Sequence, residues 1–328
     1  MTKMQRLIGL KDMKLKDINL ENPRVHKLTR EVKDLILGLF VAVILLGIVY
    51  TILAPVIGIF SLSFMSAEDV FNPTVFLIPL EPSFYNIRAA AFHMRYWSVL
   101  AYTLAYALGM ALLHVLVASF VGYGFARYKF WGNSIIFGFV LFTIIIPAQA
   151  YMVPLFMTFR FFGFGPFEWN LLDSYATMII LTATGVGLRS GLFIYVFRQF
   201  FKGLPVEISE AAFIDGAGPM RTYATVMMPN AKPAIITVLL LALVWHYGDT
   251  FYSGMLLSST TRFIHVAAAG VFTAYQTANN IHAHDAGIIA AQMVTYAGVV
   301  LVIAPILVIY AFLQRQFIEG IERSGIVG

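Results

Sequence analysis

The chain has 328 residues, of which 59% are hydrophobic and only 12% are charged, and its apolar residues form runs too long for the core of a soluble protein. It contains no cysteine, which excludes a disulfide framework, a thiolate metal site and a cysteine nucleophile. The net charge of +5 fits contact with anionic lipid headgroups, and the chain lacks the basic and aromatic pattern of RNA-binding domains. The composition predicts an all-α, polytopic membrane protein.

Six apolar stretches are long enough to cross a membrane, for which a helix needs about 20 residues. Continuous apolar blocks favour a helical bundle over a barrel, whose strands of about 10 residues alternate in polarity. The predicted spans are, approximately, residues 35–60, 97–121, 134–158, 175–197, 234–257 and 287–312. Together they define a six-span domain over residues 35–328.

Lys and Arg are distributed unevenly over the loops. With a cytoplasmic amino terminus, 17 of the 22 basic residues lie inside, four lie outside and one, Arg189, lies within a span. Because cytoplasmic loops carry the excess of positive charge, we expect both termini and the loop after the fourth span to be cytoplasmic.

Residues 1–34 form a basic leader. Leu28, Val32, Leu35 and Ile36 recur at helical spacing after Pro23, which predicts an amphipathic helix along the inner membrane surface. The alternative is a disordered basic leader.

The outer loop, residues 61–96, contains three prolines, which disfavour long helices and favour turns or extended chain. We expect a small external element there. Its aromatic residues could contact something that docks from outside, or the element could be a cap packed on the bundle. These residues are Phe71, Phe76, Phe84, Tyr85 and Phe92.

The loop of residues 203–233 is about 30 residues long, where helical connections usually have about 2–8. Pro205 suits the first turn of a helix, and Gly216 and Gly218 are expected to end that helix after Ile214. Acidic residues near its amino end favour the helix dipole. The small residues Ala211, Ala212, Gly216 and Ala217 would let another backbone approach closely, so the loop has the character of a docking surface.

This loop carries a recognisable motif. Glu210-Ala211-Ala212 is followed by Gly216 six positions after Glu210 and by Val226-Met227-Met228-Pro229. The pattern resembles the cytoplasmic coupling loop of ABC importer permeases. The resemblance extends over residues 35–328 through Phe125-Ala126-Arg127, Phe130, Ile146-Pro147, Pro154, Arg198-Gln199-Phe200-Phe201, Gln314-Arg315, Phe317, Gly320, Gly325 and Gly328.

The resemblance is to the smaller six-span permease of maltose-type and glycerol-phosphate-type importers, with the type I importer fold. It implies import of a sugar or oligosaccharide through the cell membrane of a prokaryote. The implied partners are a second permease, two cytoplasmic ATPase subunits and an extracytoplasmic binding protein. The coupling residues that would contact the ATPase are Glu210, Ala211, Ala212, Asp215, Gly216, Ala217 and Pro229. The chain would end in a cytoplasmic tail of residues 314–328.

The chain contains no Gly-x-x-x-x-Gly-Lys-Ser/Thr phosphate loop. We therefore expect no enzymatic activity and no cofactor in this chain, and ATP and Mg²⁺ would be bound by the partner ATPases. Replacing Gly216 by a bulky residue should uncouple ATP hydrolysis from transport.

The fifth span departs from many sugar permeases, which carry Trp-Asn-x-Phe where this chain reads Trp245-His246-Tyr247-Gly248-Asp249-Thr250-Phe251-Tyr252. Candidate pathway residues are Arg189, Trp245, Tyr247, Asp249 and Tyr252. Arg189 and Asp249 are ionisable at membrane depth, where such residues usually face a cavity. They could bind sugar hydroxyls, pair with each other or pair with the second permease. Gly185-Val186-Gly187 predicts a weakened or bent helix beside Arg189.

Other interpretations stay open at this point. A phosphate ester, peptide or oxyanion could be the solute, and a channel or secondary transporter would also fit the composition. A metal site at His282-Ala283-His284-Asp285 is not expected, because residues two apart lie on opposite sides of a helix and no dense ligand cluster accompanies them.

Overall fold

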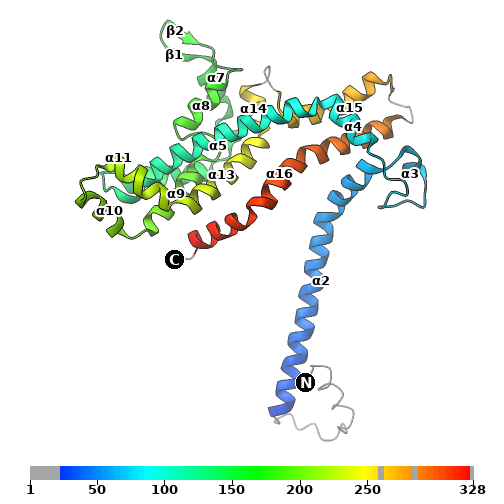
Figure 1. Cartoon of the computed structure of the whole chain (residues 1–328), viewed down its shortest axis with the longest axis horizontal. Coiled ribbons are helices and arrows are strands. Elements are labelled where there is room, and N and C mark those ends of the chain that lie inside the picture. Colours follow the sequence, from blue (N-terminus) through cyan, green and yellow to red (C-terminus); the bar gives the residue numbers. More distant parts are fainter. Residues whose placement is uncertain (1–22, 258–261, 283–286, 326–328) are drawn as a thin grey trace. The chain divides into compact units, whose positions relative to one another are not determined.

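The computed structural model describes residues 23–257, 262–282 and 287–325. The chain divides into two compact units, residues 1–61 and 62–328, which are considered separately. Within the described ranges helices dominate (Figure 1). The strands β1 (Phe162–Phe164) and β2 (Phe167–Trp169) form a small antiparallel hairpin, with Phe162 paired to Trp169. The prediction of an all-α protein is confirmed.

The helix α2 (Pro23–Phe64) is continuous over 42 residues. Pro23 sits at its first residue, where a missing amide hydrogen costs nothing, and the next proline inside the helix is Pro55. Residues 23–34 are helical and continue directly into the first span, and their position along the inner membrane surface stays a prediction. Residues 1–22 of the predicted leader lie outside the described residues.

The outer loop contains two short helices, α3 (Ala67–Phe71) and α4 (Tyr85–Met94). The α4 helix packs on α15 (Ile264–Ala278) and α16 (Gly287–Gly325) through its buried residues Ala90 and Met94. The five aromatic side chains named above nevertheless remain 58–88% exposed. The element is thus packed on the bundle by one face and presents aromatic rings on another.

The core is built around α5 (Tyr96–Arg127), which packs against α9 (Ser190–Gly203) and α13 (Lys232–Tyr247). Figure 1 shows these helices running side by side. Phe193, Phe197 and Phe201 of α9 are completely buried between them. A Cβ atom at Gly122 would lie only 2.8 Å from the Cβ of Phe197, so a glycine is required where α5 and α9 cross.

Three of the predicted spans are interrupted. The α6 helix (Asn133–Ile145) is followed by η2 (Ala148–Tyr151) and α7 (Met152–Arg160) after a bend of 105° at Ile146-Pro147. The fourth span consists of α8 (Tyr175–Ala183) and α9, separated by residues 184–189. The fifth ends with α13 at Tyr247, and α14 (Phe251–Leu256) follows. The predicted spans over residues 134–158, 175–197 and 234–257 are therefore each built from more than one helix.

The breaks have local causes. Pro147 has no amide hydrogen for a helical hydrogen bond, and Gly185 adopts φ +73, a left-handed conformation that favours glycine. Arg189 is also left-handed, with φ +58, although it is not a glycine. The bend expected from Gly185-Val186-Gly187 is thus present as a complete interruption of the helix.

Between α9 and α13 lie α10 (Val206–Ile214), α11 (Pro219–Thr222), the π-helical turn η3 (Tyr223–Met227) and α12 (Met228–Asn230). The segment Pro219–Asn230 meets α13 at an angle of 80°. By length and composition, three helices of the described chain could cross a membrane, or up to five if each bent pair forms one span.

Candidate functional site

The α10 helix has ends that its sequence dictates. Pro205 is the N-cap, in an extended conformation. At the other end Gly216 has φ +80, its N–H donates to the carbonyl of Phe213 at 3.0 Å, and the N–H of Ala217 donates to the carbonyl of Ala212 at 2.9 Å. These two bonds form a Schellman motif, in which the left-handed position is usually glycine. The helix expected between Pro205 and Ile214 is confirmed, with Gly216 fixing its end.

The two sides of α10 differ in their surroundings. Ser209 and Ala212 are buried and face α11 and η3. Glu210, Ala211, Asp215 and Gly216 are exposed, and Pro229 lies farther along the same loop. Ala217 is half-buried.

Large apolar side chains are also exposed on this loop, although it lies outside the predicted spans. Ile214 is 86% exposed, Met220 60% and Val206 55%. Apolar side chains beside exposed carboxylates, on a helix with fixed ends, make a surface suited to docking another protein.

The end of α5 anchors the start of α10. The Arg127 guanidinium donates from Nη2 to the carbonyl of Leu204 at 2.8 Å and to that of Pro205 at 3.3 Å. About two turns before Arg127 in α5, the hydroxyl of Ser119 lies 2.8 Å from that of Tyr223, the first residue of η3. From the sequence, Arg127 was identified only as part of a family resemblance. Its position at the end of an apolar run, before a polar loop, was the available signal.

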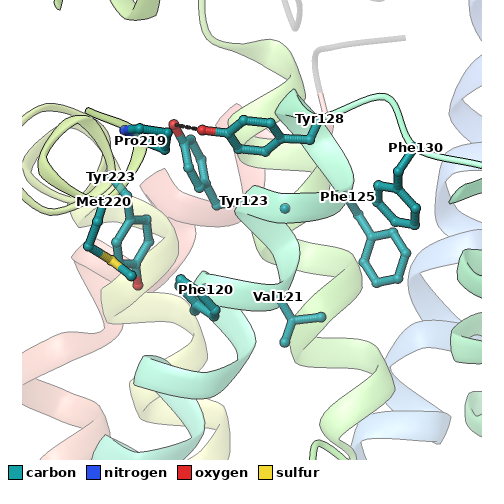
Figure 2. A pocket seen from close by; sticks show the side chains of 10 residues that line it. Phe120, Val121, Tyr123, Phe125, Tyr128, Phe130, Pro219, Met220 and Tyr223 are labelled. Carbon is teal, nitrogen blue, oxygen red and sulfur yellow. Dashed lines mark hydrogen bonds between the residues drawn. The ribbon is translucent and has the colours of Figure 1, made fainter. Parts of the chain in front are cut away.

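An apolar pocket of about 540 Å³ lies between α5 and α11 (Figure 2). Figure 2 shows the rings of Tyr123 and Tyr223 on one side and those of Phe125 and Phe130 on the other, with a hydrogen bond of 3.4 Å between the hydroxyls of Tyr123 and Tyr128. The loop is thus held by polar bonds at Arg127 and Ser119 and borders unfilled apolar space beside them. This pocket was not predicted from the sequence.

A second cavity, of about 590 Å³, lies where the three helix breaks meet. Its walls include residues 143–149 at the end of α6, residues 185–192 between α8 and α9, and Phe251 and Tyr252 after α13. The α6, α9 and α13 helices have 13, 14 and 16 residues, so at 1.5 Å per residue each spans about 20–24 Å. Irregular backbone at membrane depth occurs where it is buried in protein or lines a cavity, which fits this arrangement.

Three predicted pathway residues lie at or beside this cavity. Arg189 lines it, and its guanidinium carbon lies 5.3 Å from the ring centre of Trp245. Tyr252 also lines it, with its hydroxyl 2.6 Å from that of Tyr151. The structure therefore brings Arg189, Trp245 and Tyr252 together.

The other two pathway candidates are engaged elsewhere. The Tyr247 hydroxyl donates to the carbonyl of Val302 in α16 at 2.7 Å. Asp249 is buried and caps α14: one carboxylate oxygen accepts the N–H groups of Phe251 and Tyr252 at 3.1 Å, and the other accepts that of Ser253 at 2.8 Å. Asp249 is not paired with Arg189, so the expected alternative of an ion pair between these two residues is excluded.

Three buried polar side chains, which were not predicted from the sequence, are hydrogen-bonded in a row beside the cavity. The Nε2 atom of His114 lies 3.0 Å from the hydroxyl of Ser190, and its Nδ1 lies 3.0 Å from Nε2 of His246. All three side chains are at most 3% exposed. This row of side chains connects α5 and α13 to Ser190, the first residue of α9, next to Arg189. A lone histidine in the apolar run 97–121 was the only available signal.

The described residues contain no group of three or more His, Cys, Asp and Glu placed to hold a metal ion. Most of the stretch His282–Asp285 falls outside them.

With this geometry established, comparison with known proteins gives the class. The chain belongs to the family of binding-protein-dependent transport system inner membrane components, whose model matches residues 115–323. It is therefore a membrane-embedded component of a binding-protein-dependent transport system and not an enzyme.

Particular relatives agree. The chain is 28% identical over 226 residues to the maltodextrin transport system permease protein MdxG of Bacillus subtilis, covering 69% of this chain and 74% of the relative. It is 27% identical over 276 residues to the trehalose transport system permease protein SugB of Mycobacterium tuberculosis, covering 84% and 93%.

A solved structure has the same fold. It is a bacterial ABC transporter involved in the import of the acidic polysaccharide alginate, and its chain matches with a TM-score of 0.69 at 24% identity. The match covers 87% of this chain and 98% of that chain. The predicted type I ABC importer permease fold is confirmed.

Proposed function

We propose that this chain is one of two permease subunits of an ATP-driven importer for a sugar or oligosaccharide, coupled to a separate ATPase through the loop around Glu210–Gly216. The observation that carries the proposal is α10, a helix with fixed ends that presents exposed apolar and acidic side chains beyond the predicted spans.

The coupling residues divide into two roles. Ala212 and Ser209 pack α10 onto the rest of the loop. Glu210 and Ala211 face outward, where the carboxylate can make charge-assisted hydrogen bonds to a partner and the methyl group permits close packing. Gly216 sets the turn, so a rigid α10 would move as a body when the ATPase closes.

The cavity at the three helix breaks is the proposed section of the translocation pathway that this chain contributes. Arg189, Gln149 and the paired hydroxyls of Tyr151 and Tyr252 offer hydrogen bonds, and Trp245 lies beside them. The relatives named for maltodextrin and trehalose transport support a saccharide as the solute.

The remaining assignments follow from the charge pattern and the family. Both termini and α10 would be cytoplasmic because the basic residues concentrate on that side. A second permease, two ATPase subunits and an extracytoplasmic binding protein would complete the assembly, with ATP and Mg²⁺ bound by the ATPases. The cell membrane of a prokaryote is the proposed location.

The test is the ATPase activity, in lipid nanodiscs, of the complex that co-purifies with this chain, with and without saccharide-loaded binding proteins. We expect one loaded binding protein to stimulate hydrolysis and the substitution Gly216→Trp to abolish that stimulation. The matched control is Gly165→Trp, since Gly165 is also left-handed, with φ +61 and open space around it, but lies in the β1–β2 hairpin. An intact preparation without any associated ATPase would overturn the proposal in favour of a channel or secondary transporter.

A further inference from the structure

The charge of the cavity at the three helix breaks is not balanced within the chain. Among the described residues that line it, Arg189 is the only charged one, and none is a carboxylate. The Arg189 guanidinium lies over the Trp245 ring and makes no hydrogen bond or ion pair to another described residue. A guanidinium has five N–H donors in a fixed plane, so nearly all of its bonding capacity is unused within the described chain.

Asp249, the acidic candidate predicted for the pathway, forms no ion pair with Arg189. Both carboxylate oxygens of Asp249 are occupied by the backbone N–H groups of the first turn of α14, and the side chain is only 6% exposed. These bonds turn the carboxylate oxygens toward the backbone of α14. The cavity therefore keeps its positive charge.

The backbone adds to this field. Gly191 and Leu192, in the first turn of the 14-residue helix α9, also line the cavity. The amino end of a helix carries roughly half a positive elementary charge, and here it lies directly beside Arg189. Guanidinium and helix end thus favour the same ligand, an anion.

The neutral groups of the wall indicate what carries the anionic group. The Tyr151 and Tyr252 hydroxyls and the Gln149 amide can hydrogen-bond to hydroxyl groups. Phe251 adds an aromatic ring. This combination of aromatic and hydroxyl-binding groups beside a single cation fits an acidic sugar residue.

We infer that the cavity accommodates an acidic saccharide, whose carboxylate binds the Arg189 guanidinium. Both a carboxylate and a phosphate ester can bind a guanidinium in a bidentate manner. An acidic sugar residue is favoured because each such residue carries one negative charge, which matches the single guanidinium, whereas a phosphate monoester carries about 1.5 to 2 charges at neutral pH. The inference rests on the proposed function in one respect, that this cavity belongs to the translocation pathway.

The experiment measures solute binding to the whole co-purified complex in nanodiscs, without binding protein, by equilibrium dialysis. The probes are digalacturonate as the acidic disaccharide, maltose as the neutral one and glucose 6-phosphate as the phosphate ester. We expect digalacturonate to bind at least about tenfold more tightly than maltose, which corresponds to about 1.4 kcal/mol, because only the acidic probe makes charge-assisted hydrogen bonds. We expect it to bind more tightly than glucose 6-phosphate as well, because its carboxylate matches the single positive charge of Arg189.

Variants assign the preference to one residue. Arg189→Gln should remove it, and Arg189→Lys should retain part of it because the charge stays but the bidentate geometry is lost. The matched control is Arg160→Gln: Arg160 also lies near an aromatic ring, 5.9 Å from that of Phe161, but does not line the cavity. It should leave the preference unchanged.

Several results would overturn the inference: equal or tighter binding of maltose or glucose 6-phosphate, no measurable binding of digalacturonate, or an unchanged preference in Arg189→Gln. The comparison of probes on the unmodified complex needs no variant, so it stands even where a variant fails to assemble. The two proposals fail separately. A complex with stimulated ATPase activity that prefers maltose refutes the acidic solute alone, whereas a complex without an ATPase refutes the importer whatever it binds.

Discussion

The loop around α10 and the cavity at the helix breaks both interrupt the helical chain, but they are built differently. The loop is closed by hydrogen bonds between near neighbours, such as Ala217 with Ala212, and exposes its apolar side chains. The cavity joins distant segments, such as Tyr151 and Tyr252, 101 positions apart. A surface formed by local bonds keeps its shape when it is moved, whereas a cavity formed by separate segments changes shape when any of them moves.

The largest effect is expected from a substitution that overfills the contact between α6 and α9. A Cβ atom at Gly191 would lie 2.8 Å from the Val140 carbonyl oxygen and still closer to the Thr143 hydroxyl. Gly191→Ala should therefore destabilise the complex by roughly 3 kcal/mol, the upper end of the range for overpacking, because one of the atoms it meets is a backbone oxygen. The thermal unfolding midpoint should fall accordingly. Gly138→Ala is the control, since nothing lies within 4 Å of that position. Equal midpoints for the two variants would mean that α6 and α9 are not tightly packed there.

The next effect concerns how the loop is attached. Arg127→Gln removes the charged donor to the Leu204 and Pro205 carbonyls, and hydrogen bonds to charged groups contribute roughly 1.5–3 kcal/mol. We expect the amides of residues 206–214 to exchange hydrogen about tenfold faster or more. Arg221→Gln, at an exposed residue of α11, should leave exchange unchanged. Unaltered protection of α10 in Arg127→Gln would show that the anchor is dispensable.

A smaller effect tests the loop's local closure. Gly216 has open space around it, so Gly216→Ala meets no clash and its cost comes from the left-handed backbone, about 1–2 kcal/mol. Gly216→Asn should cost less because asparagine tolerates this conformation. Gly218, with φ −72, should accept alanine without this penalty. Hydrogen-exchange protection of the α10 amides measures the effect of all three substitutions. An equal loss of protection for Gly216→Ala and Gly218→Ala would contradict a special requirement for glycine at position 216.

The smallest effect lies in the cavity wall. Tyr252→Phe removes one partner of the hydroxyl pair with Tyr151 and should lower stability by about 1 kcal/mol. Adding Tyr151→Phe should recover much of this, because no unpaired hydroxyl is left. A double variant whose losses simply add, measured by thermal unfolding, would show that the two hydroxyls do not interact in the assembled protein.

The same contrast explains what could be predicted from the sequence. The α10 helix follows from Pro205 at its start and Gly216 at its end, because caps act within a few residues. The interruption near Arg189 was likewise indicated by Gly185 and Gly187. Local chemistry determines these features, so neighbouring residues reveal them.

The directions of side chains at the breaks could not be predicted in this way. Asp249 and Tyr247 occur in the same short stretch as Trp245 and Tyr252, yet one caps α14 and the other bonds to α16. The rotation of each helix after a break decides which side chain faces the cavity, and packing against distant helices sets that rotation. For the same reason the hydrogen-bonded His114 and His246 were missed: 132 positions separate them.

The close crossing at Gly122 has a mechanical consequence. One end of α9 is Ser190, at the cavity wall, and the other is Gly203, with only Leu204 and Pro205 before α10. At Gly122, α9 is too close to α5 to be compressed further toward it. It is thus a straight connection about 21 Å long, through which a displacement at Gly203 would reach Ser190, the residue next to Arg189.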